Sequence, residues 1–347
     1  MPRKKSSNLP EKLPPQPTLP EALGALANQT AAKHRFSDYQ SRHATNTLRR
    51  QKGDLDLFAH FLSGLGLTPG ELFSSPEAWR SVTWGLVEGF VRWQLQQGYA
   101  LPSVNVRLSS VKTYARLAMQ SGSLPTQEYA LIRAVQGYSQ REQRRLDTRR
   151  VVKRVGLKKA APVKIKLEQA AALKDQPDTP HGRRDALLMC LLLDHGLRAG
   201  ELAGLETDQL DLEEGRLRFF RPKVGKVQTH RLSPDTLRAV QACAAHGELM
   251  PGYLLLRRTV KGGGLGAAGM SERAISERVH QLGQAAGLEG LSAHDCRHYW
   301  ATTAARRGAD PFALQEAGGW ASLTMPRRYV AEREIANEGL VGDEDSE

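Results

Sequence analysis

From His294 to Tyr329 the chain reads HDCRHYWATTAARRGADPFALQEAGGWASLTMPRRY. The stretch opens with a histidine three residues before Arg297, continues to Trp320, and ends at a tyrosine that follows two arginines. Far upstream, the segment GLRAGEL carries Arg198 among apolar residues. Arginine offers a planar fork of donors that fits phosphate oxygens and keeps its charge when desolvated, and tyrosine can act as a covalent nucleophile. The set therefore favours a phosphodiester site over a metal site, and we expect neither a metal nor another cofactor.

The ordered set resembles the active-site signature of the tyrosine site-specific recombinases, the family of phage integrases and Xer-type recombinases. In that family an Arg, a Lys, a His-x-x-Arg pair, a His or Trp and a Tyr follow one another in this order. Here Tyr329 comes nine residues after Trp320 (329 − 320 = 9). The resemblance covers about residues 40–335 and is strongest from about 180 to 335.

The resemblance implies a mainly α fold with a small antiparallel β-sheet (α+β), built from a helical N-terminal core-binding domain and a mixed C-terminal catalytic domain. It implies an enzyme that cuts and rejoins double-stranded DNA at specific sites through a 3′-phosphotyrosyl intermediate, in integration, excision or resolution. It also implies a tetramer on two duplexes, with an accessory directionality factor as a candidate partner. The alternatives are a type IB topoisomerase-like enzyme, which shares this chemistry, and a catalytically silent DNA-binding protein of the same fold.

The resemblance and side-chain chemistry together give each residue an expected role. Arg198 and Arg297 would neutralise the non-bridging phosphate oxygens, and His294 would transfer protons near neutral pH. Tyr329 would be the nucleophile. Trp320 stands where many relatives have histidine, and its indole N–H can donate a hydrogen bond to phosphate but cannot transfer a proton. Outside this set, a lone histidine is more often a structural residue, and a tryptophan is as often a core residue as a functional one.

The proton donor to the departing 5′ oxygen would be a lysine in a β-hairpin. The segment RPKVGKVQTHRL offers Lys223 and Lys226. We favour Lys223, at the junction of strand and turn, over Lys226, and two solvated turn lysines are the alternative. Glu201 follows Arg198 by three residues (201 − 198 = 3), as a carboxylate does in many relatives, and is expected to support the site. The expected catalytic residues are Arg198, Lys223, His294, Arg297, Trp320 and Tyr329.

The composition favours a polyanionic partner. The 347 residues include 49 Lys and Arg against 37 Asp and Glu, which gives a net charge of +12, and each phosphate contact releases counterions. The widely separated Cys190, Cys243 and Cys296 are expected to be buried free thiols in a reducing cytoplasm. No apolar stretch follows Met1 as a secretory signal would require, and the longest apolar run, 186–193, is too short to span a membrane. We therefore expect a cytoplasmic, nucleoid-associated protein without membrane contact.

The length predicts two domains rather than one. Several prolines before residue 21 favour a flexible or extended tail. The segment 141–166 holds eleven basic residues against two acidic ones, which favours a solvated linker that contacts the DNA backbone. The expected order is a flexible tail at 1–34, a helical core-binding domain at 35–140, a basic linker at 141–166, a catalytic domain at 167–336 and an acidic tail at 337–347.

Apolar residues recur at helical spacing in three segments of the first domain, at 48–62, 84–95 and 102–115. The polar face of the third segment is basic. Alone, such a face is more often merely solvated, but beside the C-terminal signature it favours DNA contact. The expected DNA-binding residues are Arg107, Lys112, Arg116, Arg149, Arg150, Lys153, Arg154, Lys158 and Lys159.

The second domain is expected to combine helices with one hairpin. Two strand-like segments flank a turn that contains Pro222 and Gly225, and Gly196 is expected to stop a buried helix. The expected strands are 216–220 and 229–232, and the expected helices are 167–173, 185–195, 234–246, 271–286, 294–306 and 310–317.

Overall fold

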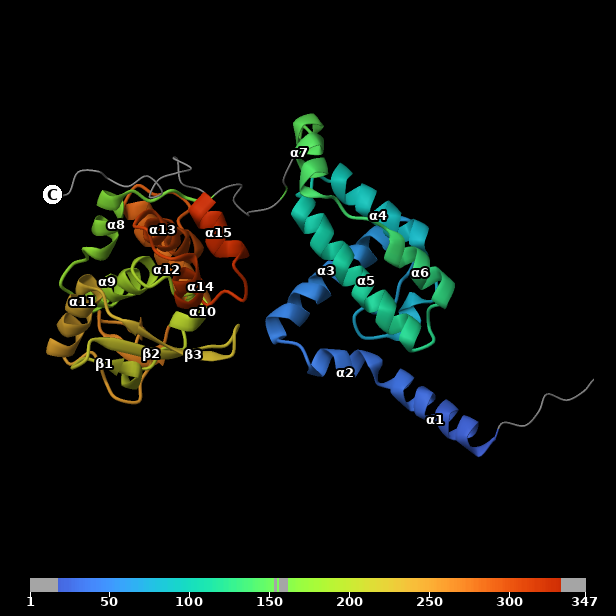
Figure 1. Cartoon of the computed structure of the whole chain (residues 1–347), viewed down its shortest axis with the longest axis horizontal. Helices are drawn as coiled ribbons and strands as arrows, with labels where there is room; N and C mark the ends of the chain where they lie inside the picture. Colours follow the sequence, from blue (N-terminus) through green and yellow to red (C-terminus); the bar gives the residue numbers. More distant parts are fainter. Residues whose placement is uncertain (1–17, 153–154, 156–161, 332–347) are drawn as a thin grey trace, which may run out of the picture. The chain divides into compact units, whose positions relative to one another are not determined.

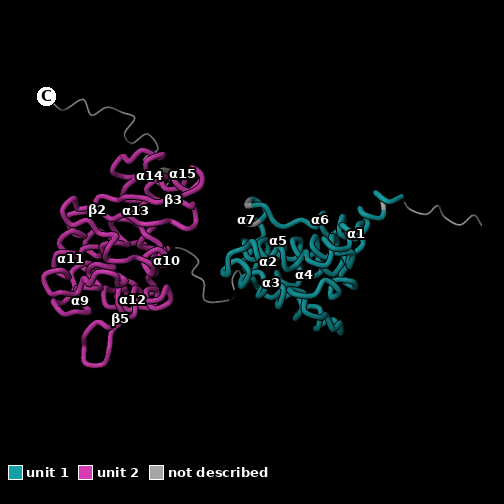
Figure 2. Tube along the Cα trace, turned by 90° about the horizontal axis from the view of Figure 1, so that it is seen from below, with its two compact units in different colours: residues 1–158 teal, residues 159–347 magenta. Residues whose placement is uncertain are grey.

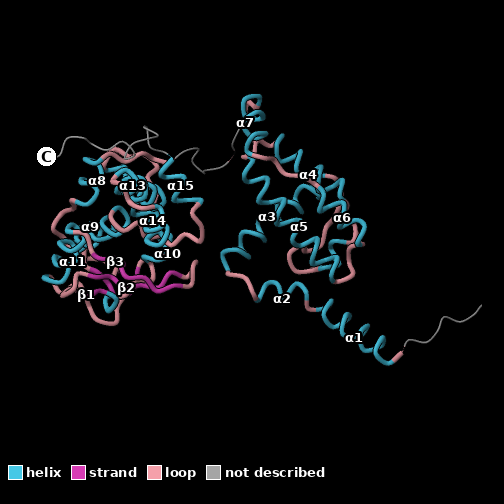
Figure 3. The backbone as a smooth tube through the Cα atoms, viewed as in Figure 1, coloured by secondary structure: helices cyan, strands magenta, loops and turns pink. Residues whose placement is uncertain are grey.

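Helices dominate the described part of the chain, which comprises residues 18–152, 155 and 162–331 of a computed structural model (Figure 1). The strands are short and form two antiparallel sheets, one of three strands and one of two (Figure 3). The chain divides into two units, residues 1–158 and 159–347 (Figure 2). The expected class, mainly α with a small antiparallel sheet, is confirmed.

The first unit consists of helices. Its central helix spans Leu101–Gln120, where Val104, Leu108, Val111 and Ala115 are buried at the expected spacing. These residues join Phe58, Trp79 and Phe90 in one apolar core. In chain order the elements are α1 (Leu19–Lys33), α2 (Arg35–Ser41), α3 (Thr45–Gly64), the 3-10 helix η1 (Pro76–Trp79), α4 (Trp84–Gln96), α5 (Leu101–Gln120), α6 (Thr126–Ala134) and α7 (Gln140–Arg149).

Helix α1 corrects part of the expectation for the tail at 1–34. Residues 19–33 are helical, where we expected flexible or extended chain. Pro20 lies in the first turn of α1, where proline is tolerated because the first N–H groups have no partner within the helix. The rest of the segment is rich in alanine and leucine, which have high helix propensity. Residues 1–17 lie outside the described residues.

The first part of the expected linker at 141–166 is also helical. Helix α7 begins after Ser139, whose side chain accepts the backbone N–H of Glu142 at 3.3 Å. The Glu142 carboxylate in turn accepts the Ser139 backbone N–H at 2.8 Å. This reciprocal capping box stabilises a helix start that the density of like charges had led us to overlook. Residues 153–154 and 156–161 lie outside the described residues.

The second unit places a three-stranded sheet at one side of a group of helices (Figure 1). Its elements are α8 (Leu167–Lys174), α9 (Pro180–Leu193), α10 (Ala199–Leu202), the 3-10 helix η2 (Thr207–Gln209), β1 (Leu210–Asp211), β2 (Arg216–Arg221), β3 (Lys226–Arg231), α11 (Pro234–Ala245), β4 (Arg257–Thr259), β5 (Leu265–Gly269), α12 (Glu272–Ala285), α13 (Ala293–Arg306), α14 (Pro311–Gly318) and α15 (Thr324–Ala331).

Helix α9 is the core element of the second unit. It packs against α8, α11 and α13, and every residue from Leu187 to Leu193 is buried. The helix begins at Pro180 and not at residue 185 as expected. Thr179 caps it by accepting a backbone N–H of the first turn at 3.1 Å, and proline is favoured at the first helical position.

The expected hairpin is confirmed as β2 and β3, which pair antiparallel from Arg216 opposite Arg231 to Arg221 opposite Lys226. Strand β1 pairs with the other edge of β2. The burial of β2 alternates along the strand, so one face meets the core. The pair β4 and β5 was not expected, because its glycine-rich sequence lacks the alternation that marks a strand.

No helix in the described ranges has both the length and the apolar character that crossing a bilayer requires.

We expect Leu188→Ala to lower the free energy of unfolding by about 2–5 kcal/mol, because this fully buried side chain of α9 leaves a cavity when truncated. Urea unfolding followed by circular dichroism measures the change. The matched control is Leu167→Ala at the start of α8, where the side chain is exposed and the change should stay within about 0.5 kcal/mol. Equal losses in both variants would contradict the central place of α9.

Candidate active site

The C-terminal end of α14 forms the floor of the candidate site. Arg297, on α13, donates hydrogen bonds to the backbone oxygens of Gly196 and Gly318. Arg198 donates to Gly319 O at 3.0 Å and to Gly318 O at 3.4 Å. The last carbonyls of a helix have no partner within the helix and carry the negative end of its dipole. Two guanidinium groups from distant segments therefore meet at this helix end.

A third guanidinium group, from Arg221 at the end of β2, contacts the same C-terminal end of α14. Arg221 donates to Ala317 O at 2.8 Å and to Gly318 O at 3.3 Å. It also donates to Gln228 Oε1 and to the Glu201 carboxylate at 3.0 and 3.1 Å. The side chain is fully buried. Sequence reasoning missed Arg221, because an arginine at a strand end is ordinarily solvent-exposed.

Glu201 joins two of these arginines. Its carboxylate accepts from Arg198 Nη1 at 2.6 Å as well as from Arg221, and it also accepts the Arg198 backbone N–H at 2.9 Å. The expected supporting role of Glu201 thus has a structural counterpart in contacts to both neighbours. With Arg297 included, three positive groups face one carboxylate, which leaves a formal charge of +2 (3 − 1).

Burial is the main cause that lowers the pKa of Arg297 to about 9, and the positive charges of Arg198 and Arg221 act in the same direction. Even so, the group keeps its proton at neutral pH. Such a crowded, desolvated set of cations favours the binding of an anion.

Aromatic rings line one side of the site. The guanidinium carbon of Arg297 lies 4.5 Å from the ring centroid of Trp320, a distance at which a cation is attracted to an aromatic face. The Trp320 ring lies 5.6 Å from Tyr329 and stacks on Trp300 at 6.0 Å. His298 meets the Tyr329 ring edge-on at 5.0 Å. The Tyr329 side chain is only 1% exposed.

His294 lies in the first turn of α13, with its side chain at the surface. Desolvation lowers the pKa of His294, and the nearby charges of Arg297 and Arg198 lower it further, while Asp295 opposes them. A lowered pKa favours the neutral imidazole at neutral pH, which is the form that accepts a proton. Asp295 also accepts the Val163 backbone N–H at 3.1 Å and so ties this turn to the segment before α8.

The two candidate lysines have different surroundings. Lys226 forms an ion pair with Glu316 of α14, with 3.4 Å between Nζ and Oε2. Lys223 lies exposed in the turn of the hairpin, which is closed by Arg221 O accepting the backbone N–H of Gly225 at 2.9 Å. Lys226 thus contacts α14 and Lys223 lies in the turn, and the choice of Lys223 as the proton donor stays a prediction.

Two glycines permit the close packing at the end of α14. Gly319 adopts a left-handed conformation with φ of 57° as the C-cap, and a Cβ there would collide with the Arg221 side chain. A Cβ at Gly318 would enter the Trp320 ring. Only glycine combines the positive φ with the absence of a side chain.

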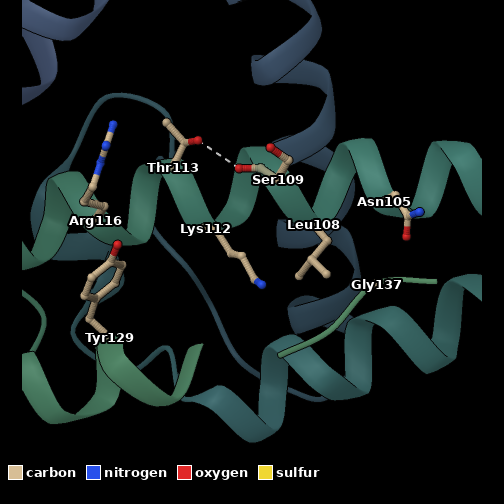
Figure 4. A pocket seen from close by; sticks show the side chains of 8 residues that line it. All are labelled: Asn105, Leu108, Ser109, Lys112, Thr113, Arg116, Tyr129 and Gly137. Carbon is tan, nitrogen blue, oxygen red and sulfur yellow. Dashed lines mark hydrogen bonds between the residues drawn. The ribbon is translucent and has the colours of Figure 1, made fainter. Parts of the chain in front are cut away.

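The expected DNA-binding residues of the first unit are only partly free to contact DNA. A cavity of about 470 Å³ on α5 is lined by Lys112, Arg116 and Tyr129 among others (Figure 4). Arg116 is exposed there. Lys112 donates to Arg133 O at 2.9 Å and to Val135 O, and so caps the end of α6; its burial lowers its pKa.

Arg107 and Arg150 also make contacts within the first unit. The guanidinium of Arg107 lies 4.1 Å from the Tyr99 ring centroid, and Arg150 donates to Leu95 O at 3.2 Å and to Tyr99 O at 2.8 Å. The remaining expected residues, Lys153, Arg154, Lys158, Lys159 and the side chain of Arg149, lie outside what the structure describes.

The phage integrase family matches residues 164–334. This match identifies a phage integrase family domain in the second unit. Tyrosine recombinase XerC of Thermodesulfovibrio yellowstonii is 25% identical over 306 residues, which cover 84% of this chain and 87% of that protein. XerC of Chromohalobacter salexigens is 28% identical over 312 residues, covering 86% and 90%.

Solved tyrosine recombinase structures share the fold. The Tn1549 transposon integrase in complex with circular intermediate DNA has a TM-score of 0.60 at 16% identity, covering 90% of this chain and 99% of that one. The lambda integrase tetramer bound to a Holliday junction has a TM-score of 0.59 at 16% identity, covering 90% and 82%.

We expect Glu201→Gln to lower the free energy of unfolding by about 3–5 kcal/mol, because it leaves two arginines at a buried position without their carboxylate. The control is Glu316→Gln, which removes an exposed ion pair with Lys226 and should cost less than about 1 kcal/mol. Urea midpoints measured at one pH compare the two. A Glu201→Gln variant with an unchanged free energy of unfolding would show that the carboxylate does not hold the arginines in place.

Proposed function

We propose that this chain is a site-specific DNA recombinase that breaks and rejoins strands through a tyrosine-linked intermediate. The observation that carries the proposal is the meeting of Arg198, Arg297, Trp320 and Tyr329 around the end of α14. The family match over residues 164–334 and the recombinases that match more than four fifths of the chain support a recombinase over a type IB topoisomerase.

In the proposed reaction, the Tyr329 oxygen attacks the scissile phosphorus and gives its proton to His294. The bond between phosphorus and the 5′ oxygen breaks, and that oxygen takes a proton from the Lys223 ammonium. Arg198 and Arg297 neutralise the charge that develops on the non-bridging oxygens. The products are a 3′-phosphotyrosyl enzyme and a free 5′ hydroxyl. Because the covalent link conserves the bond energy, religation needs no nucleotide cofactor.

The burial of Tyr329 has a consequence for this reaction. A side chain that is 1% exposed cannot reach a DNA phosphate in the described conformation. The arginines are likewise hydrogen-bonded to the carbonyls of α14. We infer that DNA binding is accompanied by a shift of α15 that exposes the phenol, while the arginines exchange part of their carbonyl contacts for phosphate oxygens.

The proposed partners are double-stranded DNA and further copies of this chain, in a tetramer on two duplexes, with an accessory directionality protein as a third partner. The solved integrases of this fold that are bound to DNA, one of them as a tetramer, support this arrangement. In the first unit, exposed Arg116 beside the cavity on α5 is the proposed backbone contact, and the basic segment after α7 would add salt-dependent affinity.

We expect Tyr329→Phe to abolish the covalent protein–DNA adduct on a nicked suicide substrate, because the ring packing is kept and only the nucleophilic oxygen is lost. Denaturing electrophoresis detects the adduct, and a mobility shift measures DNA affinity, which should change less than about threefold.

The matched control is Tyr299→Phe, which removes a phenolic oxygen from the neighbouring helix α13. This variant should form the adduct at the wild-type rate. Adduct formation by Tyr329→Phe would assign the nucleophile to another residue.

We expect the single-turnover rate of adduct formation to fall on acidification with an apparent pKa below 6.5. The pKa of His294 is lowered, so the imidazole stays neutral and able to accept a proton until the pH drops through that lowered value. A pH–rate profile of His294→Asn should lack this acidic limb and run about 10²- to 10⁴-fold slower. Persistence of the limb in the variant would remove His294 from the role of base.

A further inference from the structure

We propose that Arg221 is a positioning residue that fixes the proton-donating Lys223 relative to the arginines of the phosphate site. This inference rests on the proposed function and adds to it a residue outside the expected catalytic set. The Arg221 side chain is fully buried, and all three nitrogens of its guanidinium group are bound to protein acceptors, so we assign it no phosphate contact. Its effect must therefore pass through the groups that it holds.

Arg221 controls the turn that carries Lys223 from both its backbone and its side chain. Its carbonyl oxygen accepts the backbone N–H groups of Val224 at 3.2 Å and Gly225 at 2.9 Å, and so closes the turn. Its guanidinium group, meanwhile, is bound to the end of α14 through Ala317 O at 2.8 Å. The turn is thus anchored two residues before Lys223, on the floor of the phosphate site.

The opposite strand of the hairpin is anchored to the same helix. Gln228, on β3, accepts from Arg221 Nε and donates to Glu316 O at 2.5 Å. Lys226 adds an exposed ion pair with the Glu316 carboxylate. Both strands of the hairpin therefore contact α14, and the Arg221 side chain links the two strands to each other.

The link to the phosphate ligands passes through Glu201. One carboxylate accepts from Arg221 Nη1 at 3.0 Å and from Arg198 Nη1 at 2.6 Å. Movement of the hairpin end would change the hydrogen bonds of this carboxylate, and so would movement of Arg198. The proton donor and the phosphate-binding arginine thus share one rigid frame, as general acid catalysis requires when the donor must lie within hydrogen-bond reach of the leaving oxygen.

Lysine cannot replace Arg221 in this frame. The guanidinium group spreads its donors over three nitrogens, and all three are used, by Gln228, by Glu201 and by Ala317. Lysine carries its three donors on one nitrogen, which cannot come within hydrogen-bond distance of three acceptors spread around a planar guanidinium group. Arg221→Lys therefore keeps the charge and removes the frame.

The step that should suffer is proton transfer to the departing 5′ oxygen. An alkoxide is a strong base and leaves poorly without a proton, whereas a thiolate is the anion of a much stronger acid and leaves without one. DNA with sulfur in place of the bridging 5′ oxygen therefore needs no general acid. The bond from phosphorus to sulfur breaks, and the sulfur leaves as the anion.

The experiment compares adduct formation by the full chain on suicide substrates that carry oxygen or sulfur at the 5′ bridging position. We expect Arg221→Lys to be slowed about 10²-fold on oxygen and to come within about threefold of wild type on sulfur. Lys223→Ala should behave in the same way. Arg198→Ala should be slow on both substrates, because its loss affects the non-bridging oxygens.

Arg218→Gln is the matched control. Arg218 lies on the same strand β2, with its side chain exposed on the opposite face, and this variant should match wild type on both substrates. A second variant, Gln228→Ala, removes one acceptor of the frame and keeps Arg221 itself. It should show a smaller loss on oxygen with the same recovery on sulfur, which provides the test if Arg221→Lys proves to be unfolded by circular dichroism.

Equal slowing of Arg221→Lys on oxygen and sulfur would overturn the proposal, because a general distortion of the pocket affects both substrates alike. If Arg221→Lys is unfolded, equal slowing of Gln228→Ala on both substrates would overturn the proposal in the same way. Full activity of a folded Arg221→Lys on oxygen would overturn it as well. Failure of the proposed function is distinguishable, since wild-type protein would then form no adduct on either substrate.

Discussion

The hydrogen bonds between three guanidinium groups and the last carbonyls of α14 connect β2, α13 and the start of α10 to one helix end. Arg198, Arg221 and Arg297 come from segments up to 121 residues away from the carbonyls that they contact. A helix end supplies such a meeting point because its final carbonyls lack partners within the helix and carry partial negative charge. The hairpin, α10 and α13 therefore all contact the C-terminal end of α14, and Trp320 is the residue after the C-cap of that helix.

The same hydrogen bonds lower the free-energy cost of burying these cations in the absence of a bound anion. Buried positive charges are costly unless hydrogen-bonded and paired, and here backbone oxygens and the single carboxylate of Glu201 offset that cost in part. A formal excess of positive charge remains at this helix end, which favours an anionic ligand. In the proposed reaction these donors already converge on one helix end, so the reorganisation is confined to the shift of α15 and the exchange of carbonyl contacts for phosphate oxygens.

The sequence allowed the residues with distinctive chemistry and spacing to be predicted, and the structure explains why others escaped. Arg198, Arg297, Trp320 and Tyr329 form an ordered pattern, and two strand-like segments around a Pro- and Gly-containing turn predicted the hairpin. Arg221 has no such mark. Its burial depends on where α14 ends, which is a matter of tertiary packing. The helices α1 and α7 were missed because proline content and charge density outweighed local capping and propensity in our reading.

The sharing of Glu201 between Arg198 and Arg221 links the effects of substitutions at these positions. Groups in one buried network have effects that do not add, because each substitution changes what its partners experience. A single replacement leaves an unmatched charge, while a compensating pair removes the mismatch. The effects of substitutions at these three positions on stability should therefore be strongly non-additive, whereas substitutions at exposed surface positions should act independently.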